Sequence, residues 1–381
     1  MSTISAPKPD IVQTAGILGL PDELLLEIAK EFHGDLALDD LRHLALAQRR
    51  FRHVVHKMLI RNGVVPMRSI PRYVELVSKH SDWICHIKKI KLVDGKTVNN
   101  TPGSNVSQSA VGACYGLVRA LWSHILGNQE EEFRREMKSS GLWALVLFAA
   151  FGNLRELSLE FKNSHWPEVY HTLLLSPAYQ IQMPLNILRH YLYEVLAKRL
   201  EVLCIMTDMP VDQMNGHPIK RLELYHMERL KTLTVSGKVL WHSMAVPLSV
   251  LPANLEVLQI YCDQSTCPWF FLEQLHFWMS ASNHFARLRQ VQLFFSLPCR
   301  SLARYVVCQA KPARILGHGN ITISKLLDDW KKLGTSFETY FLNRGEPGQS
   351  ALDPRQYRQS CLLEEIKYAM EKRGRPINSS V

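Results

Sequence analysis

The chain has 381 residues, of which 46% are hydrophobic and 21% are charged, and its formal net charge is +10 at neutral pH. This length and composition are ordinary for a soluble globular protein with room for one small and one large domain. We expect neither a signal peptide nor a membrane span, because the longest apolar run, Leu142–Phe151, is too short to cross a bilayer. The expected location is therefore cytoplasmic, nuclear or both.

Residues 1–16 are polar and are expected to form a flexible tail, and three helical patterns follow within residues 17–62. The first pattern begins at Pro21, a residue that is tolerated in the first turn of a helix. Apolar residues recur at helical spacing as Leu24, Leu25 and Ile28, then as Leu41 and Leu44, and then as Phe51, Val54 and Val55. Three helices of this length make a core that is small for independent stability, which favours a binding partner.

A continuous motif joins these three patterns. It reads Leu-Pro-Asp-Glu-Leu-Leu-Leu-Glu-Ile at residues 20–28, Asp-Leu-Arg-His-Leu at residues 40–44 and Arg-Arg-Phe-Arg at residues 49–52, and it ends in the apolar residues Met58, Leu59 and Ile60. This motif resembles the F-box, in the form found in large F-box families of filamentous fungi. The resemblance extends more loosely into the helix and strand predicted after Pro66.

The resemblance implies a role in ubiquitin transfer. An F-box binds the Skp adaptor, which bridges to a cullin and a RING subunit, so the chain would be a non-catalytic, substrate-recognising subunit of an E3 ubiquitin ligase. The motif carries more apolar side chains than three helices can bury, and a partner groove would cover the excess. The expected adaptor-binding residues are Leu20, Pro21, Leu24, Leu25, Ile28, Leu41, Leu44, Ala47 and Phe51. Leu20 and Pro21 are the best candidates, whereas Ile28, Leu44 and Phe51 could equally be core.

A second pattern runs through residues 66–342. The spacing apolar-x-x-apolar-x-apolar recurs there, and each copy predicts a short strand with one buried face. The copies start at Ile87, Leu154, Leu200, Ile219, Leu230, Leu255 and Leu288. Helical or loop segments lie between most of them, and this alternation is typical of a leucine-rich-repeat solenoid.

Two architectures remain open for this region. Polar residues fill the positions between the apolar ones, as at Arg155, Glu156 and Ser158, and this favours an irregular leucine-rich-repeat-like α/β solenoid. The copies are unevenly spaced, and the step from Ile219 to Leu230 is too short for a full repeat, which would fit a non-repeat α/β domain instead. The expected fold class is therefore α/β overall, with a small all-α N-terminal domain.

Further elements are predicted from apolar periodicity and composition. Helices are expected near residues 73–80, 111–126 and 141–151, and residues 270–279 are expected to form a helical or loop segment between two strands. Residues 343–359 are rich in Gly, Pro, Gln and Arg and are expected to be mobile, and a C-terminal amphipathic helix is expected to complete the segment 343–381.

No catalytic motif or phosphate-binding loop is recognisable, and no cofactor is expected. The eight cysteines include no Cys-x-x-Cys pair, which indicates reduced thiols. The nearest zinc-like set is Cys262, Cys267, His276 and His284. Its wide spacing and interleaved aromatic residues favour a packed core over a metal site.

Charge is unevenly distributed, because residues 1–60 hold seven Lys/Arg and eight Asp/Glu, and the rest of the chain therefore carries +11. Basic residues beside predicted strand starts are weak candidates for binding an acidic or phosphorylated protein target, namely Arg155, Lys220, Arg221, Lys231 and Arg289.

Functions of a different class are less favoured by the sequence. A basic protein could bind nucleic acid, but the chain lacks the dense Lys/Arg block that such binding usually shows. An enzyme on an α/β scaffold would need an acid, base or nucleophile set that the motifs do not supply. The helical N-terminal domain could also bind a Skp adaptor without directing ubiquitination, or could act as a helical cap with no partner.

Overall fold

The computed structural model of the chain describes residues 20–30, 43–46, 51–52, 62–66, 69–80, 84–93, 107–126, 140–161, 194–207, 224–242, 247–262, 269–282, 284–295, 323–342 and 357–359. Contacts divide the chain into two units, Met1–Gly63 and Val64–Val381. The predicted N-terminal tail, most of the third helical pattern and the predicted C-terminal helix lie outside the described residues.

The first unit contains helix α1 (Asp22–Lys30) and further helical residues at 43–46 and 51–52. The first turn of α1 closes where the Leu25 N–H donates to the Pro21 carbonyl oxygen at 3.1 Å. Leu25 is fully buried and Ile28 is half-buried one turn later, so the helix turns one apolar side inward. This pattern agrees with the helix predicted from the apolar spacing.

The second unit is an α/β structure that is built on one sheet. Its strand order is β1-β2-β3-β4-β5-β6-β7-β8-β9, which is also the order along the chain. The strands are β1 (Asn62–Pro66), β2 (Lys89–Val93), β3 (Glu156–Phe161), β4 (Val202–Thr207), β5 (Thr232–Ser236), β6 (Val257–Cys262), β7 (Gln290–Phe295), β8 (Ser336–Leu342) and β9 (Tyr357–Gln359). Strands β2 to β8 pair in parallel, each with the next, and β9 pairs antiparallel with β8.

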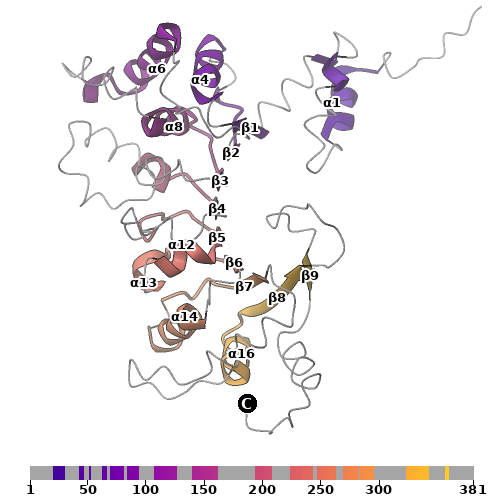
Figure 1. The fold of residues 1–381 in the computed structure, drawn as a ribbon, viewed down its shortest axis with the longest axis vertical. Coiled ribbons are helices and arrows are strands. Elements are labelled where there is room, and N and C mark those ends of the chain that lie inside the picture. Colours follow the sequence, from indigo (N-terminus) through magenta and orange to yellow (C-terminus); the bar gives the residue numbers. More distant parts are fainter. Residues whose placement is uncertain are drawn as a thin grey trace, which may run out of the picture. The chain divides into compact units, whose positions relative to one another are not determined.

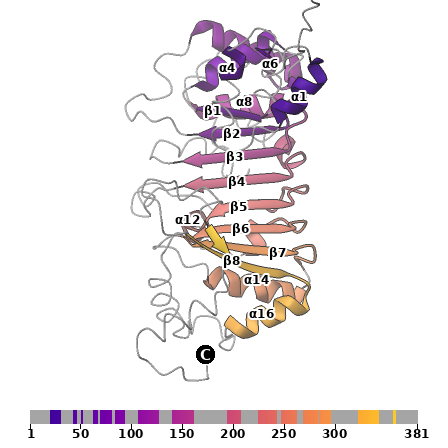
Figure 2. The ribbon, with the colours of Figure 1, turned by 90° about the vertical axis from the view of Figure 1, so that its right-hand side faces the viewer.

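Helices lie on one side of this sheet. They are α4 (Ile70–Lys79), α6 (Gln108–Leu126), α8 (Ser140–Ala150), α12 (Gly237–His242), α13 (Pro247–Val250), α14 (Trp269–Ser282) and α16 (Ile323–Lys332). Figure 1 shows α6, α8, α12, α13 and α14 on the same side of the strands, and Figure 2 shows the strands stacked in chain order. Parallel neighbours require a crossover, and connections through one side of the sheet supply it. The three predicted helices are confirmed by α4, α6 and α8, and residues 270–279, which were expected to be helical or loop, lie in α14.

The core of the second unit consists of apolar columns that run from strand to strand. The parallel register aligns equivalent residues, and every member of two of these columns is buried. One column is Ile90, Leu157, Leu203, Leu233, Leu258 and Val291, and the other is Leu92, Leu159, Ile205, Val235, Ile260 and Leu293. The apolar spacing therefore predicted six strands correctly, because its second and third positions point toward the helices.

The strands of the sheet differ from the predicted set at two places. The match that starts at Ile219 adds no strand between β4 and β5, because these strands pair directly from Val202↔Thr232 to Ile205↔Val235. Its last residue, Leu224, lies outside any strand, and residues 219–223 lie outside the described residues. Strand β8 was not predicted, because Thr339 takes the position that the aliphatic Leu293 has in β7.

Two smaller differences concern the same end of the sheet. Gly334 has a φ of 78°, a left-handed conformation that suits glycine and that ends α16 directly before β8. Residues 357–359, which were expected within a mobile segment, form β9 and cover part of the outer edge of β8.

The strand starts share a hydrogen-bond pattern that sets the register. The Lys88 carbonyl oxygen accepts the N–H groups of Arg155 at 2.8 Å and of Glu156 at 3.0 Å. The carbonyl oxygens of Arg155, Glu201, Lys231 and Glu256 each accept two successive N–H groups of the following strand start in the same way. Each strand is thus aligned on its predecessor at its first residue.

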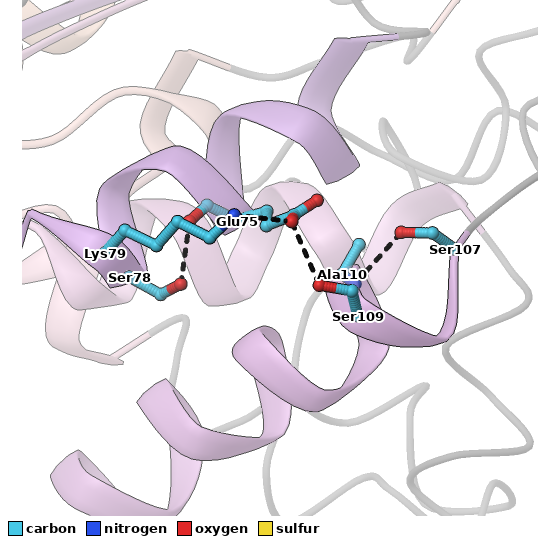
Figure 3. Close-up of polar contacts among 6 residues, drawn as sticks. All are labelled: Glu75, Ser78, Lys79, Ser107, Ser109 and Ala110. Atoms are coloured by element: carbon cyan, nitrogen blue, oxygen red, sulfur yellow. Dashed lines mark hydrogen bonds and ion pairs between the residues drawn. The ribbon is translucent and has the colours of Figure 1, made fainter.

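Helices α4, α6 and α8 pack against one another beside the first strands. Figure 3 shows the polar contacts between α4 and the start of α6. The Glu75 carboxylate accepts hydrogen bonds from Lys79 Nζ and Ser109 Oγ, both at 2.9 Å, and these bonds lower the pKa of Glu75. Ser107 caps α6, because its Oγ accepts the Ala110 N–H at 3.1 Å.

Replacing Ser107 by alanine is expected to lower the free energy of unfolding of the second unit by about 1 kcal/mol, because the Ala110 N–H loses its acceptor. Chemical denaturation followed by circular dichroism measures this change. Ser78→Ala is the matched control, because Ser78 Oγ only donates to the Glu75 carbonyl oxygen within α4, and its loss should cost less than about 0.5 kcal/mol. Equal effects of the two substitutions would contradict the capping role.

Candidate functional site

The predicted adaptor-binding residues separate into a buried and an exposed set. Leu25 and Phe51 are buried, and they therefore belong to the core of the first unit. Leu20, Ile28 and Leu44 are half-buried, Pro21 is exposed, and Leu24 is 50% exposed. Leu41 and Ala47 lie outside the described residues. Among the side chains whose burial the structure describes here, the exposed apolar ones are thus Pro21 just before α1 and Leu24 within it.

Leu46 is a further exposed apolar residue in the first unit that was not singled out from the sequence. It is 72% exposed, at the end of helical residues 43–46. The neighbouring Ala45 carbonyl oxygen accepts a hydrogen bond from Arg52 Nε at 3.2 Å. The last arginine of the Arg-Arg-Phe-Arg step therefore has a structural role, since it ties two helical segments of this unit together.

The sheet of the second unit has a second candidate surface on the side away from the helices, which we call the helix-free face. Residues that alternate with the buried columns point to this side, and Figure 2 looks onto it. Its central column is Lys91, Ser158, Cys204, Thr234, Gln259, Gln292 and Glu338, and all seven residues are half-buried. The surface is therefore polar along its middle.

Charges on β2 and β3 neutralise one another on the helix-free face. Lys89 Nζ lies 3.0 Å from a Glu156 carboxylate oxygen, and Lys91 Nζ forms an ion pair with Glu160. Both pairs bridge two neighbouring strands. This end of the face consequently presents paired charges rather than a net charge.

From β5 to β8 the same column forms a directional chain of hydrogen bonds. Thr234 Oγ1 donates to Gln259 Oε1 at 2.6 Å, and Gln259 Nε2 donates to Gln292 Oε1 at 2.6 Å. Gln292 Nε2 then donates to Glu338 Oε2 at 2.7 Å. Every donor points toward β8, so the side-chain dipoles align toward the Glu338 carboxylate.

Glu338 receives two more hydrogen bonds from neutral donors. Gln290 Nε2 donates to its Oε1 at 2.9 Å, and the Tyr340 hydroxyl donates to its Oε2 at 2.6 Å. Desolvation raises the pKa of Glu338, but the hydrogen bonds from Tyr340, Gln292 and Gln290 together outweigh it and lower that pKa. Desolvation and the contact with Glu338 raise the pKa of Tyr340 to about 12. At neutral pH the pair is thus an anionic carboxylate and a neutral phenol.

An aromatic stack lies beside this chain on the helix-free face. The Tyr261 and Phe294 rings are stacked with centroids 4.4 Å apart, and the Phe294 and Tyr340 rings are stacked with centroids 4.7 Å apart. Met206 extends the stack toward β4, and Met206, Tyr261 and Phe294 are buried. The stack fixes the position of Tyr340, and through it one of the donors to Glu338.

The basic residues predicted beside the strand starts share this region with an acidic residue, Glu201. Arg155 Nε lies 3.7 Å and Lys231 Nζ 3.4 Å from the Glu201 carboxylate between them. Arg289 is exposed at the start of β7, and Lys220 and Arg221 lie outside the described residues. Glu201 was overlooked because its position between Arg155 and Lys231 depends on strands that are far apart in the sequence.

The zinc-like set is dispersed over separate elements. Cys262 ends β6 and His284 lies in the turn after α14, whereas Cys267 lies outside the described residues. His276 in α14 faces α16, with its Nε2 3.7 Å from Asp329 Oδ2. Within the described part of the chain, no three His, Cys, Asp or Glu side chains are grouped as a metal site would need.

The thiols of Cys114 and Cys204 are in their protonated form. Desolvation raises the pKa of Cys114, and it also raises the pKa of Cys204 to about 11 despite a hydrogen bond with Ser158. A thiol of this kind is a poor nucleophile at neutral pH. Of the helices that the structure describes, none has the length and apolar character to span a membrane.

The comparisons with known proteins identify no relative. No protein-family model matches the sequence, and no curated protein matches it. The class of protein that the structure defines is therefore an α/β protein with a parallel sheet, a small helical N-terminal unit and a polar helix-free face.

Proposed function

We propose that the chain is a non-catalytic, substrate-recognising subunit of a Skp–cullin–F-box ubiquitin ligase that works in the cytoplasm or nucleus. The first unit would bind the Skp adaptor, and the second would hold a protein target. Such a subunit acts by proximity, because it raises the effective concentration of a target lysine near the conjugating enzyme. The motif at residues 20–60 is the basis of this proposal.

One structural observation supports adaptor binding most directly. Leu24 is 50% exposed on α1, although its neighbour Leu25 is fully buried in the first unit. The first unit leaves half of this leucine uncovered, and burial in a partner groove would add about 1–2 kcal/mol of stabilisation. Pro21, also exposed, would extend the same contact at the start of the helix.

We also propose that the second unit is an irregular leucine-rich-repeat solenoid. The support is that strands follow one another in chain order, that helices occupy one side and that the second and third apolar positions recur in register. The strands β5 and β6 start 25 residues apart and β2 and β3 start 67 residues apart, so the repeats would be of very unequal length. Such a solenoid offers a continuous sheet face to a target.

The test is co-purification of the full chain with a Skp adaptor. Leu24→Lys keeps a good helix-forming residue and is expected to weaken adaptor binding at least about ten-fold, because it places a charge in an apolar groove. Leu76→Lys is the matched control, since Leu76 is 43% exposed on α4 in the second unit. The Leu76→Lys variant should bind the adaptor as the wild type does.

Two outcomes would count against the proposal. Wild-type protein that is folded and does not bind the adaptor would leave the first unit as a helical cap only. Equal adaptor binding by the wild type and the Leu24→Lys variant would exclude α1 from the interface. If the adaptor binds, reconstitution with the cullin and RING subunits then shows whether ubiquitin transfer follows.

A further inference from the structure

Glu338 differs in its partners from the acidic residues on β3 of the helix-free face. Glu156 and Glu160 on β3 each form an ion pair with a lysine on β2. Glu338 on β8 is held by Gln290, Gln292 and Tyr340, which are all neutral. Within the described ranges, no lysine or arginine forms an ion pair with Glu338, so its negative charge is not neutralised locally.

The hydrogen-bond chain holds this carboxylate in place for a ligand. A carboxylate offers about four acceptor directions, and three are occupied by Gln290, Gln292 and Tyr340. One direction therefore remains, on a side chain that is only half-buried. Because the donors fix the carboxylate beforehand, a ligand would lose little free energy in ordering it.

The neighbouring Gln259 side-chain amide can also form a further hydrogen bond. Gln259 accepts from Thr234 and donates one N–H to Gln292, which leaves its second N–H without a use in this chain of hydrogen bonds. A peptide carbonyl oxygen laid across β6 could accept it. The helix-free face at β6 to β8 thus combines a fixed anion with a donor for a backbone group.

We propose that the helix-free face of β6 to β8 binds an extended protein segment that places an arginine or lysine side chain on Glu338. The inference deepens the proposed function, on which its biological meaning rests, by naming a basic segment as the target. Charge complementarity supports this proposal, since Glu338 is the one charged residue within the described strands β6, β7 and β8, where Gln259 and Gln292 share its column. The net charge of +10 does not oppose it strongly, because screening at physiological salt limits charge effects to about 8 Å.

The probes are fluorescein-labelled octapeptide pools that have one fixed residue and otherwise uncharged residues. The fixed residue is arginine, its neutral isostere citrulline, or glutamate. Fluorescence anisotropy with the full chain is expected to show the arginine pool binding about five-fold tighter than the citrulline pool, as a partly buried ion pair supports. Glu338→Gln is expected to abolish this preference, and Glu160→Gln is the matched control that should keep it, because Glu160 is already paired with Lys91.

A second measurement avoids any loss of folding in the Glu338→Gln variant. A lysine-fixed pool is coupled to the wild-type chain with a carbodiimide, which joins an amine to a carboxylate in direct contact, and the linked residue is identified by mass spectrometry. Linkage at Glu338, and not at Glu156 or Glu160, is expected.

Three results would overturn the inference. They are preference for the glutamate pool, which would support an acidic target instead; an arginine preference that survives in a folded Glu338→Gln variant; and coupling at carboxylates away from Glu338. These assays need no adaptor, so their failure is distinct from failure of the adaptor-binding test on Leu24.

Discussion

Replacing Leu258 by alanine is expected to lower the free energy of unfolding of the second unit by about 2–5 kcal/mol. Leu258 is fully buried in β6, and its register partners are Leu233 in β5 and Val291 in β7. The shortened side chain leaves a cavity in the middle of a continuous apolar column. Neighbours that are held by strand pairing on both sides cannot move in to fill it.

Chemical denaturation of the full chain, followed by circular dichroism, measures this loss. Leu76→Ala is the matched control, because Leu76 is 43% exposed on α4 and its truncation should cost less than about 0.5 kcal/mol. If both variants lost the same stability, the apolar column would not be the core of the sheet.

Replacing Leu25 by alanine is expected to unfold the first unit. Leu25 is fully buried, and its truncation should cost about 2–5 kcal/mol, which is comparable to the whole stability of a helical unit of this size. Amide hydrogen exchange in the full-length chain, read on peptides that cover residues 20–30, is expected to show loss of protection in α1.

Leu24→Ala supplies the comparison one residue away. Leu24 is 50% exposed, so its truncation should leave the exchange of α1 amides nearly unchanged, while adaptor binding is still expected to weaken. Similar loss of protection in the Leu24→Ala and Leu25→Ala variants would mean that the two leucines do not differ in their contribution to the core of the first unit.

The apolar spacing of the sequence predicted the core of the sheet because that core repeats locally. Leu157 and Leu159 of β3 illustrate this local repeat. Both side chains point toward the helices, and both have equivalent buried residues in β2 and β4. The same spacing also occurs at Ile219, yet no strand is inserted there, because β4 pairs directly with β5. Strand β8 was not predicted because a threonine takes the position of the aliphatic Leu293 in β7.

The surface of the sheet could not be predicted in the same way. The contact between Gln292 and Glu338 joins residues 46 apart in the sequence, and it exists only because the register aligns β7 with β8. The pairing of Arg155 and Lys231 with Glu201 has the same origin. Periodicity shows which side of a strand is buried, but partners across strands follow from the connection lengths, which vary here.

The exposure of individual side chains in the first unit could not be predicted from the sequence either. Leu24 and Leu25 are identical in type and adjacent, and both fit the apolar face of a helix that is drawn from spacing alone. Only the position of the neighbouring helical segments decides which of the two is covered. The adaptor-binding role of the exposed residues remains a proposal.

The order of the strands has a mechanical consequence. Within the described sheet, each strand from β3 to β7 is hydrogen-bonded to its predecessor and its successor along the chain. Damage at one strand therefore reaches a distant one through those between them, and opening should start at an end and spread inward. Loosening of β2 and β3 would leave the Glu338 carboxylate and its donors on β7 and β8 intact. Strands β2 and β3 at one end of the sheet can accordingly unfold while β7 and β8 at the other end remain folded.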